Sequence, residues 1–202
     1  MAELDVLDGS AAEPAAAFYF DLGSPQCYLV AERILQTMPV ATEWIPVRAG
    51  GLPGHGASAA LDREALAATL GERGLQPLRM PERFPFDSDL ALLAATYAKQ
   101  IGRVVPFALA AFRQCFAAGR ALDAQDHVLI AGSACEMHPT ALRKAADLRS
   151  TLAALDAATA LAAERGVRDV PAIWIAGRGD EPACVFHGDH GLDGAATLMA
   201  AA

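Results

Sequence analysis

The segment from Phe18 to Tyr28, FYFDLGSPQCY, constrains the fold more than any other part of the chain. Its first five residues form an apolar run of the length of a buried strand. Ser24-Pro25 is typical of a helix start, with Ser24 as the N-cap and Pro25 at the first helical position, where its missing N–H costs nothing. Apolar residues then recur at helical spacing as far as Met38. The sequence therefore predicts a strand, a short turn and one helix ending near Met38.

The first turn of that helix carries two groups with chemical potential, the hydroxyl of Ser24 and the thiol of Cys27. Helix N-termini favour anions because their N–H groups are unpaired and their dipole end is positive. One interpretation is that Cys27 ionises readily there. Another is that Ser24 holds the thiolate of a ligand. A third is that Ser24 is only a cap and Cys27 a small core residue, and the segment alone leaves all three open.

Composition excludes several classes of function. The chain has 202 residues, of which 53% are hydrophobic and 20% charged, as expected for a globular protein with a sizeable core. Its 16 basic and 24 acidic residues give a net charge of −8 without a basic cluster, so nucleic acid is not an expected partner. The apolar runs are too short to cross a membrane, and the acidic, Ala-rich N-terminus is unlike a signal peptide. We expect a cytoplasmic protein.

The four cysteines show no C-x-x-C spacing and do not form a disulfide framework in a reducing compartment. Cys115, Cys135 and Cys184 lie in helical or strand-like apolar context, so we expect them in the core. Only Cys27 lies at a helix start, which makes it the one thiol with a predicted role.

The rest of the chain alternates between an α/β frame and a helical block. Residues 42–47 read as a second strand, in which Pro46 indicates an edge or a strand end, and a Gly-rich loop follows with a solvated His55. Helical patterns continue to Arg165, including a helix capped by Asp87 or Ser88. A strand-like segment over 167–176 and its hairpin partner over 183–186, a turn over 187–191 and a helix over 192–201 complete the order βαβ, helices, ββα.

This order divides the chain into three parts. We expect a flexible tail over residues 1–16, an α/β domain made of 17–60 and 166–202, and a helical insertion over 61–165.

Four short motifs occur in this order and at a characteristic spacing: Phe18-Tyr19-Phe20-Asp21 with Ser24-Pro25, Trp44-Ile45-Pro46-Val47, Gly166-Val167 with Val170-Pro171, and Phe186-His187-Gly188-Asp189. Together they resemble the thioredoxin-like DsbA family, and within it the branch of 2-hydroxychromene-2-carboxylate isomerases and kappa-class glutathione transferases. The resemblance covers residue 18 to the C-terminus. It implies an α/β thioredoxin-like fold with a large all-helical insertion.

The resemblance also implies roles for individual residues. Ser24 stands where DsbA proteins have their first cysteine and where the isomerase branch has the serine that hydrogen-bonds the glutathione thiolate. Cys27 stands at the second cysteine position of DsbA.

The remaining implied roles concern the cofactor. Pro171 matches the cis-proline of the family, and the backbone of Val170 would pair with the glutathione peptide. The turn of Gly188 and Asp189, with His190 beside it, would hold the γ-glutamyl end.

The chain departs from the family at several of these positions. The family has an asparagine after the second strand, whereas this chain has no asparagine, and its nearest substitutes are His55 and Ser58. His190 and Gly191 replace an acidic residue and an arginine. The expected cofactor is therefore glutathione or another low-molecular-weight thiol.

The leading hypothesis is a thiol-dependent isomerase or transferase acting on a small conjugated carbonyl compound, with Ser24 at its centre. We expect the pocket between the Ser24 turn, the loop 50–58 and the segment 80–86. One alternative is thiol-disulfide oxidoreduction through the single thiol of Cys27. Another is a non-catalytic binding protein of the same fold.

Two further expectations concern metals and assembly. His187 and His190 bracket Asp189, but no fourth ligand accompanies them, so no metal site is predicted. Homodimers are common in the family, so a homodimer is a possible assembly.

Overall fold

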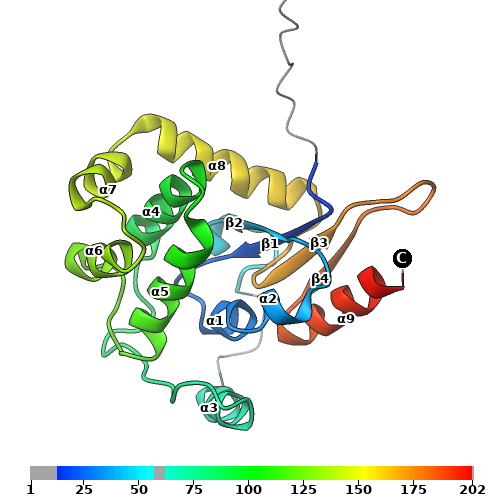
Figure 1. The fold of residues 1–202 in the computed structure, drawn as a ribbon, viewed down its shortest axis with the longest axis horizontal. Helices are drawn as coiled ribbons and strands as arrows, with labels where there is room; N and C mark the ends of the chain where they lie inside the picture. The colour runs from blue at the N-terminus through cyan, green and yellow to red at the C-terminus, as the bar shows by residue number, and fades with distance from the viewer. Residues whose placement is uncertain (1–12, 57–61, 202) are drawn as a thin grey trace, which may run out of the picture.

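The computed structural model of the protein describes residues 13–56 and 62–201. Its centre is a four-stranded sheet in the order β2-β1-β3-β4 (Figure 1). β1 pairs in parallel with β2 and antiparallel with β3, which pairs antiparallel with β4. The strands are β1 Ala16–Phe20, β2 Glu43–Pro46, β3 Ala172–Ile175 and β4 Cys184–His187.

The sequence explains the place of each of the first two strands. β1 is an uninterrupted apolar run and is buried along its whole length, as a strand covered on both faces must be. β2 lies at the sheet edge and ends at Pro46, which cannot donate to a ladder. This confirms the edge position predicted from that proline.

Helices cover the sheet and extend past its β2 edge. Figure 1 shows α1, α2 and α9 along one side of the sheet and α8 along the other, with α4 to α7 gathered beyond β2. The helices are α1 Pro25–Ala31, α2 Ile34–Thr37, α3 Arg63–Glu72, α4 Asp89–Gln100, α5 Val104–Phe116, α6 Gln125–Ser133, α7 Pro139–Ala146, α8 Arg149–Glu164 and α9 Asp189–Ala200, with a short 3-10 turn, η1, at Ala49–Gly51. The order βαβ, helices, ββα is the one that the sequence predicts.

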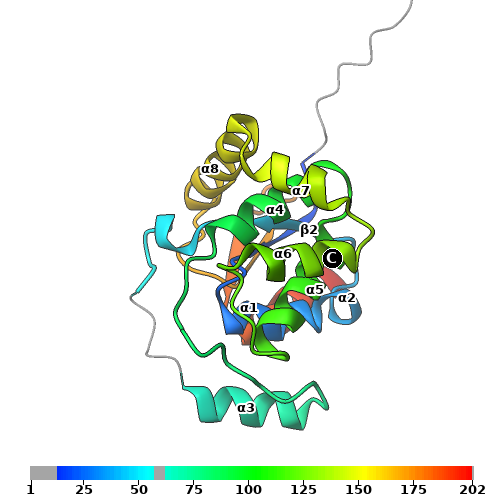
Figure 2. The same cartoon turned by 90° about the vertical axis from the view of Figure 1, so that its left-hand side faces the viewer.

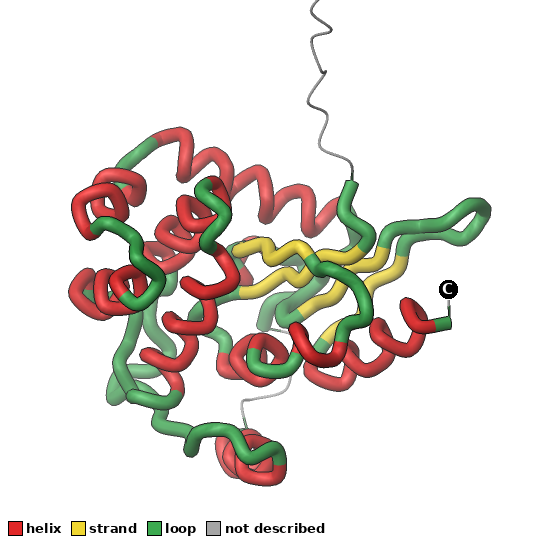
Figure 3. The backbone as a smooth tube through the Cα atoms, in the orientation of Figure 1, coloured by secondary structure: helices red, strands yellow, loops and turns green. Residues whose placement is uncertain are grey.

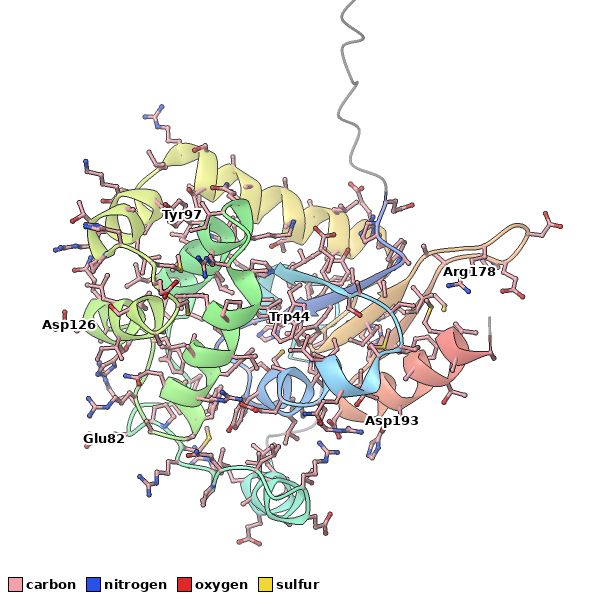
Figure 4. The ribbon with its side chains drawn as sticks, viewed as in Figure 1. Trp44, Glu82, Tyr97, Asp126, Arg178 and Asp193 are labelled. Atoms are coloured by element: carbon pink, nitrogen blue, oxygen red, sulfur yellow. The ribbon has the colours of Figure 1, made fainter. Side chains whose placement is uncertain are left out.

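Aromatic side chains join the sheet to the helical block. Trp44 lies near the middle of the molecule (Figure 4), and its ring meets those of Phe18 and Phe20 edge-on at 5.1 and 5.9 Å between centroids. Phe20 in turn contacts Phe112 of α5, at 5.9 Å. The core is therefore continuous from the sheet into the insertion, although α3 lies apart from the other helices, between loops (Figures 2 and 3).

The predicted single helix from Pro25 to Met38 is wrong, because the chain forms α1 and α2 instead. The break falls at Glu32 and Arg33, whose backbone N–H groups close the last turn of α1. Their side chains leave in different directions: Glu32 accepts both hydrogen bonds of Arg113, and Arg33 reaches α9. Long-range ion pairs thus occupy both residues at the break.

One other helix start differs from its prediction. α9 begins at Asp189, three residues earlier than predicted, because Gly188 adopts φ 74°, a conformation that favours glycine, and serves as the N-cap. The start of α4 agrees with its prediction: Ser88 is the N-cap residue and Oδ1 of Asp87 accepts the N–H of Asp89 at 2.9 Å, while the side chain of Ser88 makes no cap bond. Its hydroxyl donates to Asp21 instead, at 2.7 Å.

Within the described ranges, no helix is both long and apolar enough to cross a bilayer.

Candidate active site

Ser24 lies at the N-cap of α1, as predicted. Its backbone N–H donates to the carbonyl of Asp21 at 3.0 Å, and its Oγ accepts the N–H of Cys27 at 3.3 Å. A serine hydroxyl has one proton to donate and two lone pairs. The cap bond uses one lone pair, so the hydroxyl of Ser24 can still donate, either to the sulfur of Cys27, whose pKa it lowers, or to a ligand.

The hydroxyl of Ser24 borders a cleft of about 700 Å³. Three chain segments form its walls: the turn before α1, the loop of η1 up to Gly56, and residues 84–89 before α4. Asp169 and Val170 close it from the β3 side. The cleft lies where the sequence predicts the pocket, although Ser58 of the predicted loop lies outside the described residues.

A buried carboxyl group holds the three walls together. Asp21 Oδ1 accepts the N–H of Gly23 at 2.8 Å and the hydroxyl of Ser88 at 2.7 Å, while Oδ2 accepts the N–H of Ala49 at 3.0 Å. Burial raises the pKa of Asp21, and these hydrogen bonds offset the rise only in part. Asp21 therefore connects one donor from each wall of the cleft.

Cys27 does not behave as an activated thiol. Its side chain is fully buried, with no exposed surface. Burial raises the pKa of its thiol far above the ordinary value, and the hydrogen bond with Ser24 does not compensate. The expectation that its position at a helix start would favour ionisation is wrong, because desolvation outweighs the helix terminus.

The other cysteines follow the predictions less uniformly. Cys115 and Cys135 are buried in the core, as predicted. Cys184, at the start of β4 on the sheet edge, is only half-buried, so its assignment to the core is wrong.

The Val170–Pro171 peptide bond is cis, as the resemblance implies. Val170 borders the cleft, but its N–H already donates to Oδ1 of Asp169 at 2.9 Å. The N–H of Gly188 likewise donates to the carbonyl of Pro171 at 2.9 Å. Two backbone donors near the expected cofactor position are thus satisfied within the chain.

The carboxylate of Asp189 is engaged by two arginines and lies outside the cleft. Arg73, just after α3, binds both of its oxygens, and Arg33 approaches Oδ1 at 3.3 Å. Burial by itself would raise the pKa of Asp189, but the hydrogen bonds and charges of Arg73 and Arg33 outweigh it and hold the pKa below its usual value. Arg33 also binds Asp193, one turn along α9 (Figure 4), at 2.6 Å, while His190 points outward as an exposed residue.

Sequence reasoning missed Arg48 and Asp169 at the cleft. Arg48 binds Asp89 at 2.7 Å and also Asp156, so its charge is balanced inside the protein. His55 is exposed, as predicted, and its Nδ1 lies 3.5 Å from Oδ1 of Asp169. The one usable signal was Gly54, whose lack of a side chain permits the close backbone approach that places His55.

Among the described residues, no group of three or more His, Cys, Asp or Glu side chains is arranged to hold a metal ion.

Comparison with known proteins identifies the fold. No protein-family model matches the chain, and no curated protein is significantly similar in sequence. Among solved structures, a 2-hydroxychromene-2-carboxylate isomerase is similar with a TM-score of 0.76 at 18% identity, covering 92% of this chain and 94% of that one. A probable DsbA oxidoreductase from Streptomyces coelicolor gives 0.71 at 17% identity, covering 92% and 88%.

A third solved structure extends the same likeness. The cytosolic disulfide reductase DsbM from Pseudomonas aeruginosa gives a TM-score of 0.65 at 12% identity, covering 92% of this chain and 95% of that one. Likeness at such identities establishes the fold. The α/β thioredoxin-like fold with a DsbA-type helical insertion, predicted from the sequence, is therefore confirmed.

Proposed function

We propose that this protein is a thiol-dependent enzyme that isomerises, or adds a thiol to, a small conjugated carbonyl compound. The thiol is a low-molecular-weight cofactor whose sulfur is held at the hydroxyl of Ser24. The observation that carries the proposal is the position of Ser24 on a cleft of about 700 Å³, at a helix N-cap and beside a Cys27 thiol that is fully buried. Because its own thiol is inaccessible, the chain has a place for a thiolate but must receive the thiol from outside.

The chemistry needs no oxidant or metal. A thiol held with its sulfur at Ser24 would supply a nucleophile for reversible addition to the carbon β to the carbonyl, which permits rotation about the former double bond before the thiol is eliminated unchanged. Apolar cleft residues would position such a substrate, among them Pro25, Phe84 and Phe86.

The likeness to the isomerase at 18% identity supports this reaction class. The likeness to DsbM, also solved with GSH, supports a thiol ligand but belongs equally to disulfide reduction. Cys27 is a poor group for disulfide exchange, since its burial and its raised pKa both suppress the thiolate. Oxidoreduction through Cys27 is therefore the weaker alternative.

The identity of the thiol follows from what is open around Ser24. The N–H groups of Val170 and Gly188 and the carboxylate of Asp189 already have partners. Each of these groups would have to exchange its partner to bind glutathione. The site therefore favours a compact thiol, or glutathione held mainly through its cysteine.

Calorimetric titration with glutathione and with 2-mercaptoethanol tests the proposal. Ser24→Ala should weaken thiol binding by about tenfold, the factor expected for a hydrogen bond to a charged group. Ser24→Asp is the matched control, because aspartate caps helices as well as serine but would repel a thiolate. Loss of binding in both variants, with helix stability lost only in Ser24→Ala, supports the proposal. Absence of thiol binding in the unmodified protein would overturn it.

A further inference from the structure

The loop that carries His55 is docked directly on the backbone that precedes β3. The N–H of Gly54 donates to the carbonyl of Arg168 at 2.7 Å. A Cβ at Gly54 would lie only 2.8 Å from that oxygen and 3.0 Å from the Cβ of Arg168, so any other residue would push the loop away. The backbone next to His55 is therefore positioned by a contact that requires glycine, while the His55 side chain itself is exposed to solvent.

The imidazole of His55 faces a carboxylate that is itself held in place. Nδ1 of His55 lies 3.5 Å from Oδ1 of Asp169, and the same oxygen accepts the N–H of Val170 at 2.9 Å. The contact is within ion-pair distance but is not a hydrogen bond in this structure, and contacts at catalytic sites often tighten only when a substrate binds. With Nδ1 directed at Asp169, Nε2 is the ring nitrogen left for a ligand. His55, Asp169 and Ser24 all border the same cleft.

No positively charged side chain in the described part of the cleft wall is available to pair with a bound thiolate. Of the described residues that border it, Arg48 alone carries a permanent positive charge, and that charge is shared by Asp89 and Asp156. Asp21 and Asp87 also border the cleft and carry no cation of their own there. A sulfur that lost its proton at Ser24 would need a cation created on the spot.

We infer that His55, oriented by Asp169, is the base that removes the proton of the bound thiol. The S–H bond breaks, its proton forms an N–H bond at Nε2, and the electron pair stays on the sulfur beside the hydroxyl of Ser24. The imidazolium is balanced by Asp169 and pairs with the thiolate. The proton returns to the sulfur when the thiol leaves, so the step consumes no other reactant. This inference rests on the proposed function and assigns the proton transfer within it.

The test follows the ionisation of the thiol separately from its binding. Glutathione and 2-mercaptoethanol are titrated into the protein, binding is measured by calorimetry, and the thiolate is measured by its ultraviolet absorbance at neutral pH. Addition of the bound thiol to methyl vinyl ketone supplies a rate. His55→Gln should bind thiol but lose the thiolate band and slow the addition by about 100-fold, a typical contribution of a general base.

Three further variants separate a chemical role from a structural one. Imidazole added to His55→Ala should restore part of the rate, which repair of a merely structural contact would not do. Asp169→Asn keeps an acceptor for Val170 and should lose part of the thiolate band, which marks Asp169 as a positioning residue. His138→Gln replaces an exposed histidine that caps the N-terminus of α7, and as the control it should leave thiol binding, the thiolate band and the addition rate unchanged.

The outcomes distinguish this inference from the proposed function. If the unmodified protein binds neither thiol, both are overturned. If thiol binds and its thiolate band and addition rate are unchanged in His55→Gln, the proton-transfer role alone is overturned. Circular dichroism confirms that each variant is folded before the comparison is made.

Discussion

The two ends of the expected cofactor site differ in a way that the resemblance did not indicate. At one end, Ser24 caps α1 and borders an open cleft, and the walls of that cleft are joined through Asp21. At the other end, Asp189 is bound by Arg73 and Arg33 and lies outside the cleft. Under the proposed function, the Ser24 end remains open to a ligand, whereas the carboxylate at the expected γ-glutamyl position is bound by the chain's own arginines.

The two carboxyl groups show the physical basis of this difference. Asp21 is buried among neutral donors, so burial raises its pKa, and its hydrogen bonds do not reverse the shift. Asp189 is also mostly buried, yet two guanidinium groups hold its pKa below the usual value. The neutral donors around Asp21 join the cleft walls and leave the cleft itself open. The arginines that stabilise Asp189, in contrast, occupy the space next to its carboxylate where a ligand would bind.

The largest expected effect is that of Asp21→Ala. The N–H groups of Gly23 and Ala49 and the hydroxyl of Ser88 lose their acceptor, so the free energy of unfolding should fall by about 3 kcal/mol. Thiol binding should be lost as well, because the three walls of the cleft separate. Urea denaturation and calorimetry measure the two effects. Asp126→Ala, on an exposed position of α6 (Figure 4), is the control and should change stability by less than about 1 kcal/mol.

Retention of full thiol affinity in Asp21→Ala would show that Asp21 supports the fold without organising the site. That result would also remove the reason for treating the Ser24 end as better organised for a ligand than the Asp189 end.

Asp189→Asn should destabilise the protein by about 2 kcal/mol at neutral pH, because Arg73 and Arg33 lose a shared carboxylate. Since the folded pKa of Asp189 is lowered, its contribution to stability is present above the unfolded pKa of about 3.9 and is lost as pH falls through the lower folded pKa. Urea titrations across acidic pH should show the two proteins converging. Thiol affinity should not change, and a large loss of glutathione affinity would show that the Asp189 end does bind the cofactor.

Arg73→Ala tests the difference between the Ser24 end and the Asp189 end, because it removes one of the two arginines that bind the Asp189 carboxylate. Arg33 remains as a partner, but the carboxylate becomes able to accept the ammonium group of a γ-glutamyl end. The affinity for glutathione relative to 2-mercaptoethanol should rise by a few-fold, about the value of an exposed ion pair. Competition calorimetry measures this ratio. An unchanged ratio would mean that Arg73 does not stand in the way of the longer thiol.

The smallest expected effect concerns Cys27. Iodoacetamide should leave Cys27 unmodified in the folded protein, since its thiol is fully buried and its pKa is raised. The half-buried Cys184 should react first, and Cys184→Ser should remove most of the native labelling. Mass spectrometry of peptides identifies the modified residue. Rapid labelling of Cys27 would show that its thiol is accessible, and it would favour oxidoreduction through Cys27 over an external thiol held at Ser24.

Local signals accounted for much of the fold. Ser24-Pro25 set the start of α1, and Pro46 marked the sheet edge. The apolar run before Ser24 predicted a strand, although β1 spans Ala16–Phe20, two residues earlier than the run that starts at Phe18. The order of elements and the place of the cleft followed from these signals. They are reliable because a cap bond, a missing N–H and a run of buried side chains act within a few residues of the chain.

Only the tertiary structure decided which charged and polar groups meet. Arg73 reaches Asp189 across 116 residues and Ser88 reaches Asp21 across 67, and His55 finds Asp169 only because Gly54 permits a close backbone contact. The same burial reversed the expectation for Cys27, whose helix-start position is visible in the sequence but whose desolvation is not. The sequence by itself determined the framework and the position of Ser24. The tertiary structure determined the burial and the pKa shifts of the ionisable side chains near Ser24. The reason is that both depend on neighbours in space, which separation along the sequence does not indicate.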